Sequence, residues 1–339
     1  MIDLRSDTVT KPTPEMLEYM CQATVGDDVF GEDETVNAFQ QKMADRFGFE
    51  AGLFVPSGVM ANQIALNILS NPGDEALIEA KGHMFNYENA SASLLSSVLL
   101  KPLKGKNGKL SAGLIEPQIR GRYDWEPKTS VVILENSTNK GGGVCYTKKE
   151  LKSINDVAEH YGLHIHLDGA RIWNAITRSG IEPAFFGSIA DTMNICFSKG
   201  LGAPVGSMVL STRSGIASAR RVRKMIGGGM RQAGLLAAAA DYAVEHHFPK
   251  LEADHRRAKK LAYAISKIKG LSINPDTVET NIVLFDVKEM SAEQALEALA
   301  EYDIQMVPFG PKTIRATLHL QVDDRQIDRT IETLRSLFG

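Results

Sequence analysis

Short apolar stretches alternate with helical patterns through the first two thirds of the chain, and this alternation constrains the fold more than any other feature. The helical pattern at 149–161, for instance, places Leu151 and Ile154 on one face. Strands separated by helices pair in parallel through right-handed crossovers, so we expect an α/β domain with a mostly parallel central sheet. The strand-like stretches are 53–56, 76–78, 97–102, 130–135, 163–167, 193–197 and 206–210.

The pattern changes near residue 246, where the alternation gives way to a smaller α+β unit. At the other end of the chain, Pro12 and Pro14 argue against one continuous helix, so we expect an arm with a helix that begins near Pro14. We therefore predict an N-terminal arm at 1–30, a large α/β domain at 31–246 and a small α+β domain at 247–339. In the small domain we expect helices at 251–268, at 292–302 and from Asp323, and strands at 281–285, 304–307 and 313–317.

The composition argues against several classes of partner. The chain has 339 residues and a formal net charge of −3, so neither nucleic acid nor an anionic membrane is expected to bind it. Its three cysteines show no C-x-x-C spacing, which predicts reduced thiols in a cytoplasmic protein and no metal site. The most apolar stretch, 233–244, is interrupted by Asp241 and is too short to span a bilayer. The first residues are charged and lack the apolar segment of a signal peptide.

Lys199 lies where a buried strand is expected to end in a turn. An apolar run at 195–197 precedes it, and Gly200, Gly202 and Gly206 follow it. A lysine held in a partly desolvated pocket loses its proton more easily, and it can then form a Schiff base with an aldehyde such as pyridoxal phosphate. The alternative at this point is an ordinary solvated loop lysine.

Asp168 ends another predicted strand, in the sequence HIHLDGAR at 164–171. A carboxylate in that position suits the acid that pairs with a pyridinium nitrogen. Because the carboxyl ends of parallel strands lie at one edge of a sheet, we expect Asp168 and Lys199 to lie close together, where ligands of open α/β folds bind. A helix N-cap or a turn aspartate is the alternative for Asp168.

Two earlier segments add further candidates. Ser57, Gly58 and Val59 stand between a predicted strand and a predicted helix, where the free amides and the dipole of the first helical turn favour an anion. His83 follows another strand-like stretch, where an imidazole can stack on a flat ring and act as an acid or a base near a substrate hydroxyl. A loop histidine with ordinary polar partners is the alternative for His83.

Three arginines are candidates for binding anions. Arg315 lies on a predicted strand of the small domain, where it either anchors an α-carboxylate through its bidentate fork or faces outward. Arg171, which follows Asp168 by three residues, presents the same choice. Arg231 follows a glycine run at 227–229, which either lets the backbone approach a ligand or a neighbouring chain or forms a plain interhelical turn.

Taken together, these segments resemble the low-specificity L-threonine aldolases, pyridoxal-phosphate enzymes of fold type I, the aspartate-aminotransferase-like fold. The resemblance implies that Lys199 carries the cofactor's Schiff base, that Asp168 bonds the pyridine nitrogen and that His83 stacks on the ring. The matching segments run nearly end to end: RSDTVT at 5–10, GDDVFGED at 26–33, SGVMANQ at 57–63, HLDGAR at 166–171, SKGLGAPVGS at 198–207 and GGGMRQAG at 227–234.

The same resemblance implies the remaining contacts and the assembly. Arg231 is implied to reach the cofactor phosphate from a neighbouring subunit, because the sites of this family form between subunits of a dimer within a tetramer. We therefore expect a homodimer or a homotetramer. The other implied residues are Ser57, Gly58 and Val59 at the phosphate, Arg171 at the cofactor and the substrate, and Ser6 and Arg315 at the substrate carboxylate.

Two positions depart from the family pattern. Val59 stands where a threonine usually follows Ser-Gly, so one hydroxyl for the phosphate is missing. Thr138 stands where the family has a histidine thought to bind the β-hydroxyl of the substrate, and we expect Thr138 at the substrate instead. This substitution leaves the choice between threo and allo substrates open. Lys140 and Glu88 are alternative residues for the role of that histidine.

The sequence thus predicts a carbon–carbon lyase that cleaves L-threonine, L-allo-threonine and related β-hydroxy-α-amino acids to glycine and an aldehyde. Its predicted catalytic residues are Lys199, Asp168 and His83, with His83 taking the hydroxyl proton through a water. The nearest alternative is another pyridoxal-phosphate reaction on a small amino acid, such as β-elimination or transamination. A protein that keeps the fold without turnover and a folate-dependent hydroxymethyl transfer are the remaining alternatives.

Overall fold

A seven-stranded sheet organises the chain in a computed structural model that describes residues 1–339. The strand order is β2-β8-β7-β6-β5-β3-β4, and only β8 runs against its neighbours. The predicted α/β class with a mostly parallel sheet is therefore confirmed. The strands are β2 (Ala51–Val55), β3 (Glu75–Glu79), β4 (Leu99–Leu103), β5 (Thr129–Glu135), β6 (His164–Gly169), β7 (Thr192–Cys196) and β8 (Ser207–Ser211).

The reversed direction of β8 has a local cause. Residues 197–206 join β7 to β8 without a helix, and a parallel neighbour would need a crossover of a dozen residues or more. The chain instead turns back, so that Asn194 pairs with Val209 and Cys196 with Ser207. The turn places Lys199 just beyond the carboxyl end of β7.

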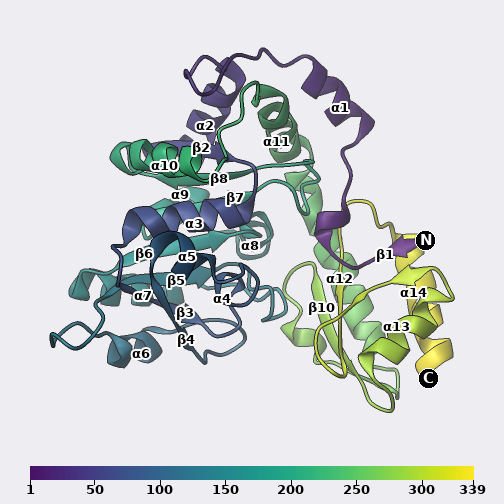
Figure 1. The fold of residues 1–339 in the computed structure, drawn as a ribbon. Coiled ribbons are helices and arrows are strands. Elements are labelled where there is room, and N and C mark those ends of the chain that lie inside the picture. The colour runs from purple at the N-terminus through teal and green to yellow at the C-terminus, as the bar shows by residue number, and fades with distance from the viewer.

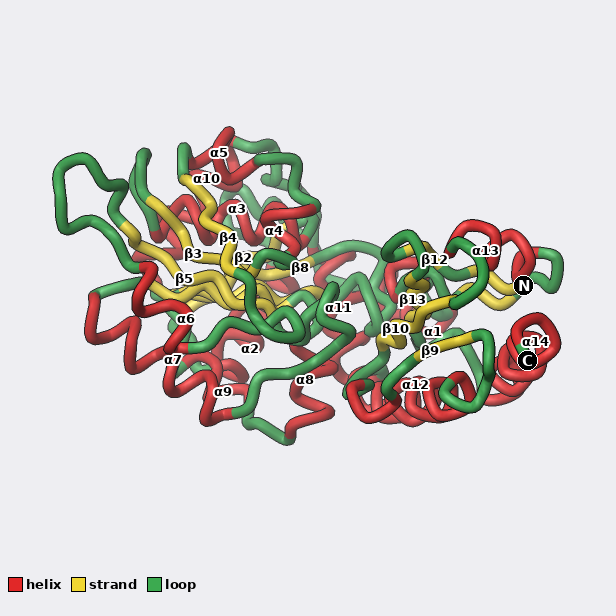
Figure 2. Tube along the Cα trace, turned by 90° about the horizontal axis from the view of Figure 1, so that it is seen from below, coloured by secondary structure: helices red, strands yellow, loops and turns green.

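Helices cover both faces of this sheet (Figures 1 and 2). Helices α3, α5 and α10 lie on one face, and α2, α7 and α9 lie on the other. The bounds of the helices in this part of the chain are α1 (Pro14–Cys21), α2 (Glu34–Phe47), α3 (Gly58–Leu69), α4 (His83–Asn86), α5 (Ser91–Ser96), α6 (Ala112–Ile115), α7 (Lys148–Tyr161), α8 (Ile172–Ser179), α9 (Pro183–Gly187), α10 (Arg213–Met225) and α11 (Gly234–His246).

Local sequence signals set the ends of these helices, as α7 illustrates. The side chain of Thr147 accepts a hydrogen bond from the amide of Glu150, and the side chain of Glu150 accepts one from the amide of Thr147. Gly162 ends the helix with a φ of 63°, which a glycine adopts without strain. The helix buries Leu151 and Ile154 against the sheet, as their spacing predicted.

The C-terminal part of the chain forms its own layer of helices against an antiparallel sheet of order β12-β13-β10-β9. The first strand of the chain, β1 (Ile2–Asp3), pairs in parallel with β11 (Ile304–Gln305), so Ile2 and Leu4 join the hydrophobic cluster of this layer. Figure 1 shows the N-terminal strand beside the C-terminal elements. The other elements are β9 (Leu271–Ser272), β10 (Ile282–Val287), β12 (Val307–Pro308), β13 (Thr313–Thr317), α12 (Leu251–Ile265), α13 (Ala292–Ala300) and α14 (Asp324–Phe338).

The predicted elements differ from the observed ones mainly at their ends. The predicted helix at 251–268 ends at Ile265, and the predicted strand at 304–307 is divided into β11 and β12. Strands β1 and β9 were not predicted, because two residues carry no periodic signal. No helix is both long and apolar enough to cross a bilayer. The boundaries of the arm and the two domains stay a prediction.

Candidate active site

A cavity of about 450 Å³ opens at the carboxyl ends of four neighbouring parallel strands. Loops that follow β3, β5, β6 and β7 line it on one side, and the N-terminal arm and the loop between β12 and β13 line it on the other. Its volume and its position at strand ends are typical of small-molecule sites in α/β proteins. A hollow of about 510 Å³ near Met1 and Arg329 is larger, but no such strand ends reach it. The lining residues are Ser6, Thr8, His83, Tyr87, Asn139, Lys140, Arg171, Lys199, Val307, Pro308, Phe309 and Arg315.

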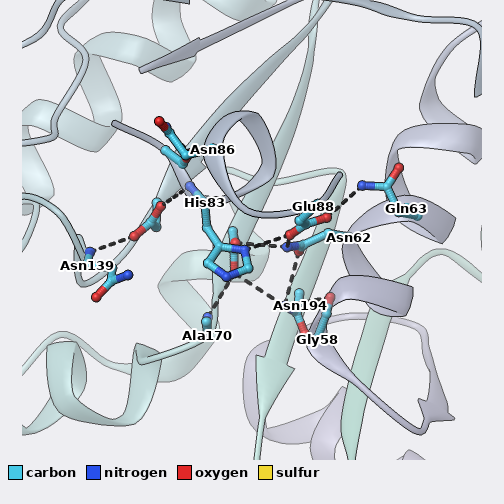
Figure 3. Close-up of polar contacts among 12 residues, drawn as sticks. Gly58, Asn62, Gln63, His83, Asn86, Glu88, Asn139, Ala170 and Asn194 are labelled. Atoms are coloured by element: carbon cyan, nitrogen blue, oxygen red, sulfur yellow. Dashed lines mark hydrogen bonds and ion pairs between the residues drawn. The ribbon is translucent and has the colours of Figure 1, made fainter. Parts of the chain in front are cut away.

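Asp168 lies at the end of β6 and is 2% exposed. Its Oδ2 accepts a hydrogen bond from Asn62 Nδ2 at 2.9 Å, and its Oδ1 accepts bonds from the amide of Ala170 at 3.0 Å and from Asn194 Nδ2 at 3.3 Å (Figure 3). All three donors are neutral. The buried carboxylate therefore suits a ligand that brings a positive charge, such as a protonated ring nitrogen.

Asn62, on α3, connects Asp168 to a second buried carboxylate, Glu88. Its Nδ2 also donates to Glu88 Oε1 at 2.8 Å, so its Oδ1 must face the other way, 3.1 Å from His166 Nε2. Burial lowers the pKa of His166 to about 4, so this imidazole is neutral at physiological pH. It therefore donates from Nε2 to Asn62 and leaves Nδ1 to accept from the hydroxyl of Thr192 at 2.9 Å.

His83 begins α4 and is held at two points. Its backbone amide donates to Glu135 Oε2 at 2.8 Å, and its Nδ1 donates to Glu88 Oε1 at 2.9 Å (Figure 3). Burial alone would lower the pKa of the imidazole, but the hydrogen bond to Glu88 and the charge of Asp168 outweigh burial and raise this pKa. Nε2 makes no hydrogen bond within the chain, so it is left for a ligand or a water.

His83, Glu88 and Asp168 each place one possible ligand atom within 4.8 Å of the others, which is a spacing that a metal ion can use. Asn62, however, directs its N–H donors at both carboxylates, and these donors repel a cation. We interpret the cluster as the acidic end of a site for an organic cofactor.

Lys199 lies in the turn after β7 and lines the cavity. Its carbonyl accepts hydrogen bonds from Thr10 Oγ1 at 2.9 Å and from the amide of Gly202 at 2.8 Å. Thr10 belongs to the N-terminal arm, so the arm holds the backbone of the lysine in place. Lys199 shares the cavity with His83 and Arg171, which follow neighbouring strands, whereas Asp168 does not line it, so the expected closeness of Asp168 and Lys199 stays a prediction.

Arg171 is engaged by Asp7 of the arm. Its Nε donates to Asp7 Oδ2 at 2.8 Å and its Nη2 to Asp7 Oδ1 at 2.7 Å, and both side chains are buried. Burial alone would raise the pKa of Asp7, but Arg171 outweighs burial and lowers this pKa to about 2. The Nε and Nη2 edge of the Arg171 guanidinium is therefore occupied, which leaves Nη1 to the cavity.

Arg315 on β13 has N–H donors that make no hydrogen bond within the chain. Its Nη1 donates to Asn139 Oδ1 at 2.8 Å and its Nη2 to the carbonyl of Arg5 at 3.0 Å, whereas its Nε is buried without a partner. Burial and the nearby charge of Arg171 lower the pKa of Arg315 to about 10. Nη1 and Nη2 each keep one N–H without a partner, and an anion in the cavity would offset the desolvation of the guanidinium, so Arg315 suits a carboxylate.

The segment 57–59 contains the cap and the first residues of α3. The hydroxyl of Ser57 caps the helix by accepting from the amide of Met60 at 3.2 Å. A Cβ on Gly58 would approach Asn194 Nδ2 to 3.4 Å and Ser207 Oγ to 3.6 Å, so glycine keeps this space open. The hydroxyl of Ser207 is buried without a hydrogen-bond partner, and Val59 is 39% exposed. A helix N-terminus beside an unused hydroxyl suits a phosphate group.

Comparison with known proteins assigns the chain to a family. Residues 3–289 match the sequence profile of the family described as beta-eliminating lyase. The low-specificity L-threonine aldolase 1 of Arabidopsis thaliana is 38% identical over 337 residues, which cover 97% of this chain and 94% of that protein. The chain belongs to the beta-eliminating lyase family. Within the beta-eliminating lyases it lies among the low-specificity L-threonine aldolases, as its sequence segments predicted.

Two further comparisons agree with this assignment. The low specificity L-threonine aldolase of Escherichia coli strain K12 is 36% identical over 328 residues, which cover 96% of each chain. The solved structure of Leishmania major threonine aldolase superposes with a TM-score of 0.84 over all of both chains, at 19% sequence identity. The predicted family and fold type are therefore confirmed.

Pyridoxal phosphate is the cofactor implied for this beta-eliminating lyase, and the residues present fit it. Asp168 carries an unbalanced negative charge at a strand end, as the ring nitrogen requires. The space at Gly58, with the free hydroxyl of Ser207, suits the phosphate. Lys199 lines the same cavity as His83.

The remaining three predicted site residues differ in whether they line the cavity. Ser6 lines it, and its hydroxyl accepts hydrogen bonds from the amide and the hydroxyl of Thr8. Thr138 does not line it, and its hydroxyl lies between the carbonyls of Asn107 at 3.2 Å and Val144 at 3.3 Å, to either of which it can donate. Arg231 also lies outside the cavity.

Arg231 instead faces a surface loop. Its side chain is 57% exposed, and its guanidinium forms an ion pair with Asp27 at 3.0 Å. No residue of the cavity contacts it within the same chain. The structure of one chain therefore brings Lys199, His83, Arg171, Arg315 and Ser6 together, but not Arg231.

Several residues of the site were not predicted. Asn62, His166 and Asp7 were overlooked, although each stands inside one of the segments that resemble the family, and Asn194, which precedes the segment at 198–207, was overlooked as well. The available signal was position: Asn62 lies one turn into the helix that begins at Gly58, and His166 precedes Asp168 by two, on the same face of β6. Glu88 was considered only as an alternative to a missing histidine.

Proposed function

We propose that this protein is an aldehyde-lyase that cleaves L-threonine, L-allo-threonine and related β-hydroxy-α-amino acids to glycine and an aldehyde. The observation that carries the proposal is one cavity that contains an amine, an imidazole and an arginine with a spare donor, Lys199, His83 and Arg315. The threonine aldolases to which the chain is similar support the same reaction.

The proposed cofactor contacts follow from the site. Lys199 would hold pyridoxal phosphate covalently through its amine, Asp168 would face the ring nitrogen and His83 would lie against the ring. Ser57, Gly58 and Val59 would bind the phosphate, with Arg231 supplied by a neighbouring subunit. When bound, pyridoxal phosphate supplies a protonated ring that accepts the electron pair released at Cα.

The chain's own residues orient the substrate and move its proton. Arg315 would bind the α-carboxylate through the N–H groups of Nη1 and Nη2 that have no partner, with Nη1 of Arg171 and the hydroxyl of Ser6 beside it. His83 has its Nδ1 proton directed at Glu88, so its Nε2 is the atom available to take the β-hydroxyl proton through a water. Thr138 has both of its hydroxyl contacts within the chain, so we do not propose it as the base.

The test is release of glycine and aldehyde from L-threonine and from L-allo-threonine, each supplied separately to the protein with pyridoxal phosphate. We expect both products in equal amounts and no release by Lys199→Ala. Formation of a keto acid without aldehyde would favour β-elimination or transamination instead. Cofactor binding without turnover of either substrate would contradict the proposed reaction.

We also propose a homodimer or homotetramer in the cytoplasm. Arg231 is exposed and lies outside the cavity, as expected of a residue that serves a neighbouring subunit's site. The three cysteines are free thiols, which is typical of a reducing compartment. Sedimentation of the purified protein tests the assembly, and a monomer with full activity would contradict it.

A further inference from the structure

The cavity carries more positive charge than a neutral amino-acid side chain needs. Five of its lining residues, named below in turn, are basic, and none is acidic. Four of them have an assigned counter-charge or role. Arg171 is paired with Asp7, His83 with Glu88, Lys199 is proposed to bind the cofactor, and Arg315 has the free donor for an α-carboxylate.

Lys140 is the remaining base, and nothing in the chain neutralises it. It forms no ion pair, and its ammonium lies 5.0 Å from the centroid of the Tyr87 ring. The side chain is half-buried, so part of its solvation is lost without a compensating anion. A lysine in this state favours a ligand that brings a second negative charge.

Lys140 also lies within reach of a small substrate held by Arg315. The residue before it, Asn139, accepts a hydrogen bond from Arg315 Nη1 at 2.8 Å, which fixes the segment 139–140 beside the carboxylate anchor. Tyr87 contacts both Lys140 and the imidazole of His83, whose ring centroid is 5.4 Å from that of Tyr87. Lys140, His83 and Arg315 line the same cavity, so the ammonium can reach a substrate whose α-carboxylate is held by Arg315.

Given the aldol cleavage proposed above, on which this inference rests, we propose that the preferred substrates are β-hydroxy-α-amino acids with a second carboxylate on the β-carbon, which Lys140 binds. The simplest is 3-hydroxyaspartate. Its hydroxyl O–H bond and its Cα–Cβ bond break, a carbonyl forms at Cβ, and Cα gains a proton. The products are glycine and glyoxylate, and the cleavage needs no oxidant or reductant.

The first experiment compares kcat/KM of the holoenzyme for 3-hydroxyaspartate and for L-threonine. Lys140→Met removes the charge and keeps the length of the side chain, whereas Lys140→Arg keeps the charge. Lys104→Met is the matched control, since Lys104 is exposed and outside the cavity. We expect Lys140→Met to lower the ratio of the two kcat/KM values by about tenfold or more. Lys140→Arg should largely keep the ratio, and Lys104→Met should leave it unchanged.

A binding measurement separates this inference from the aldol reaction itself. L-aspartate carries the second carboxylate but no β-hydroxyl, and L-2-aminobutyrate is a neutral analogue with the same number of carbons. Titration of the holoenzyme's cofactor absorbance should give a lower Kd for L-aspartate, and Lys140→Met should remove that preference. High salt should weaken it as well.

Several outcomes would overturn the inference. An unchanged substrate ratio and an unchanged preference for L-aspartate in Lys140→Met would mean that Lys140 is neutralised elsewhere, for example by a neighbouring subunit. An equal loss for both substrates would assign Lys140 a structural role. If the protein cleaves no β-hydroxy amino acid but binds L-aspartate through Lys140, the proposed reaction fails and the anion subsite stands.

Discussion

Arg171 and Asp7, which are 164 residues apart in the chain, form a bidentate ion pair with N–O distances of 2.8 and 2.7 Å. Both side chains are buried, and Asn281 Nδ2 donates to Asp7 Oδ2 at 3.1 Å. The pair therefore joins the N-terminal arm to the start of α8 and to the segment before β10, at the wall of the cavity. It fixes the position of the arginine and occupies two of its five N–H donors.

We expect Asp7→Asn to lower the free energy of unfolding by about 3 kcal/mol or more, because it leaves the buried charge of Arg171 without its partner. The pKa of Asp7 is lowered to about 2 in the folded protein, so its contribution is present above the carboxyl's ordinary pKa and is lost as pH falls toward 2. Urea unfolding at neutral and at acidic pH measures both effects. Asp328→Asn, which removes an exposed partner of Lys260, is the control and should cost less than about 1 kcal/mol.

Glu88→Gln should move the pH dependence of cleavage. Glu88 raises the pKa of His83, so in the native protein the imidazole gains its basic form only at a higher pH. Without the carboxylate this pKa falls, and the rise of kcat/KM with pH should begin at a lower pH. The pH profile of threonine cleavage and a proton NMR titration of His83 check this. If the pH profiles of the variant and the native protein have the same midpoint, Glu88 does not influence the pKa that controls cleavage.

His166→Gln should reduce the fall in the free energy of unfolding that occurs as pH is lowered into mild acid. Burial lowers the pKa of His166 to about 4, below the value of about 6.5 of an unfolded histidine. In this range the unfolded chain binds a proton on His166 and the folded chain does not. The free energy of unfolding therefore falls by about 3 kcal/mol in total as pH falls from about 6.5 to about 4. The midpoint of urea unfolding at several pH values in this window measures the slope.

His164→Gln is the matched control for that experiment. Asp191 raises the pKa of His164, so this histidine stabilises the folded state at low pH and loses its effect as pH rises through its folded pKa. His164→Gln should therefore make the free energy of unfolding fall more steeply as pH falls, which is opposite to the effect expected of His166→Gln. The same change of slope in both variants would show that burial of His166 is not the cause.

Arg315→Lys should raise KM for the amino acid far more than it changes kcat. The fork of Arg315 bonds Asn139 and the carbonyl of Arg5 and keeps one further N–H on each of Nη1 and Nη2, and a lysine ammonium cannot make these contacts and a bidentate contact to a carboxylate. We expect kcat/KM to fall on the order of tenfold to a hundredfold. Steady-state kinetics with L-threonine measure it, together with the Kd of pyridoxal phosphate, which should change little. A matching loss of cofactor affinity would point to a collapse of the cavity.

Much of the site was predictable because its residues stand at the ends of periodic segments. The apolar run before Lys199 and the strand before Asp168 were readable from local sequence, and strands alternating with helices placed both at one sheet edge. Thr138 was expected at the substrate because of its position in the segment ENSTN. Its hydroxyl bonds to Asn107 and Val144 show that the neighbouring loop, and not that segment, decides where the side chain points.

The sequence by itself determined the order and type of most helices and strands, the family, and the residues at the strand ends. These depend on apolar periodicity and on glycine, proline and capping residues, which act over a few neighbouring positions. Only the tertiary structure decided that Asn62 bridges Glu88 and Asp168, that Asp7 occupies Arg171, and that Lys140 has no counter-charge. Such partners are far apart in sequence, and packing and desolvation of the folded chain, not local propensity, determine which charged and polar groups meet.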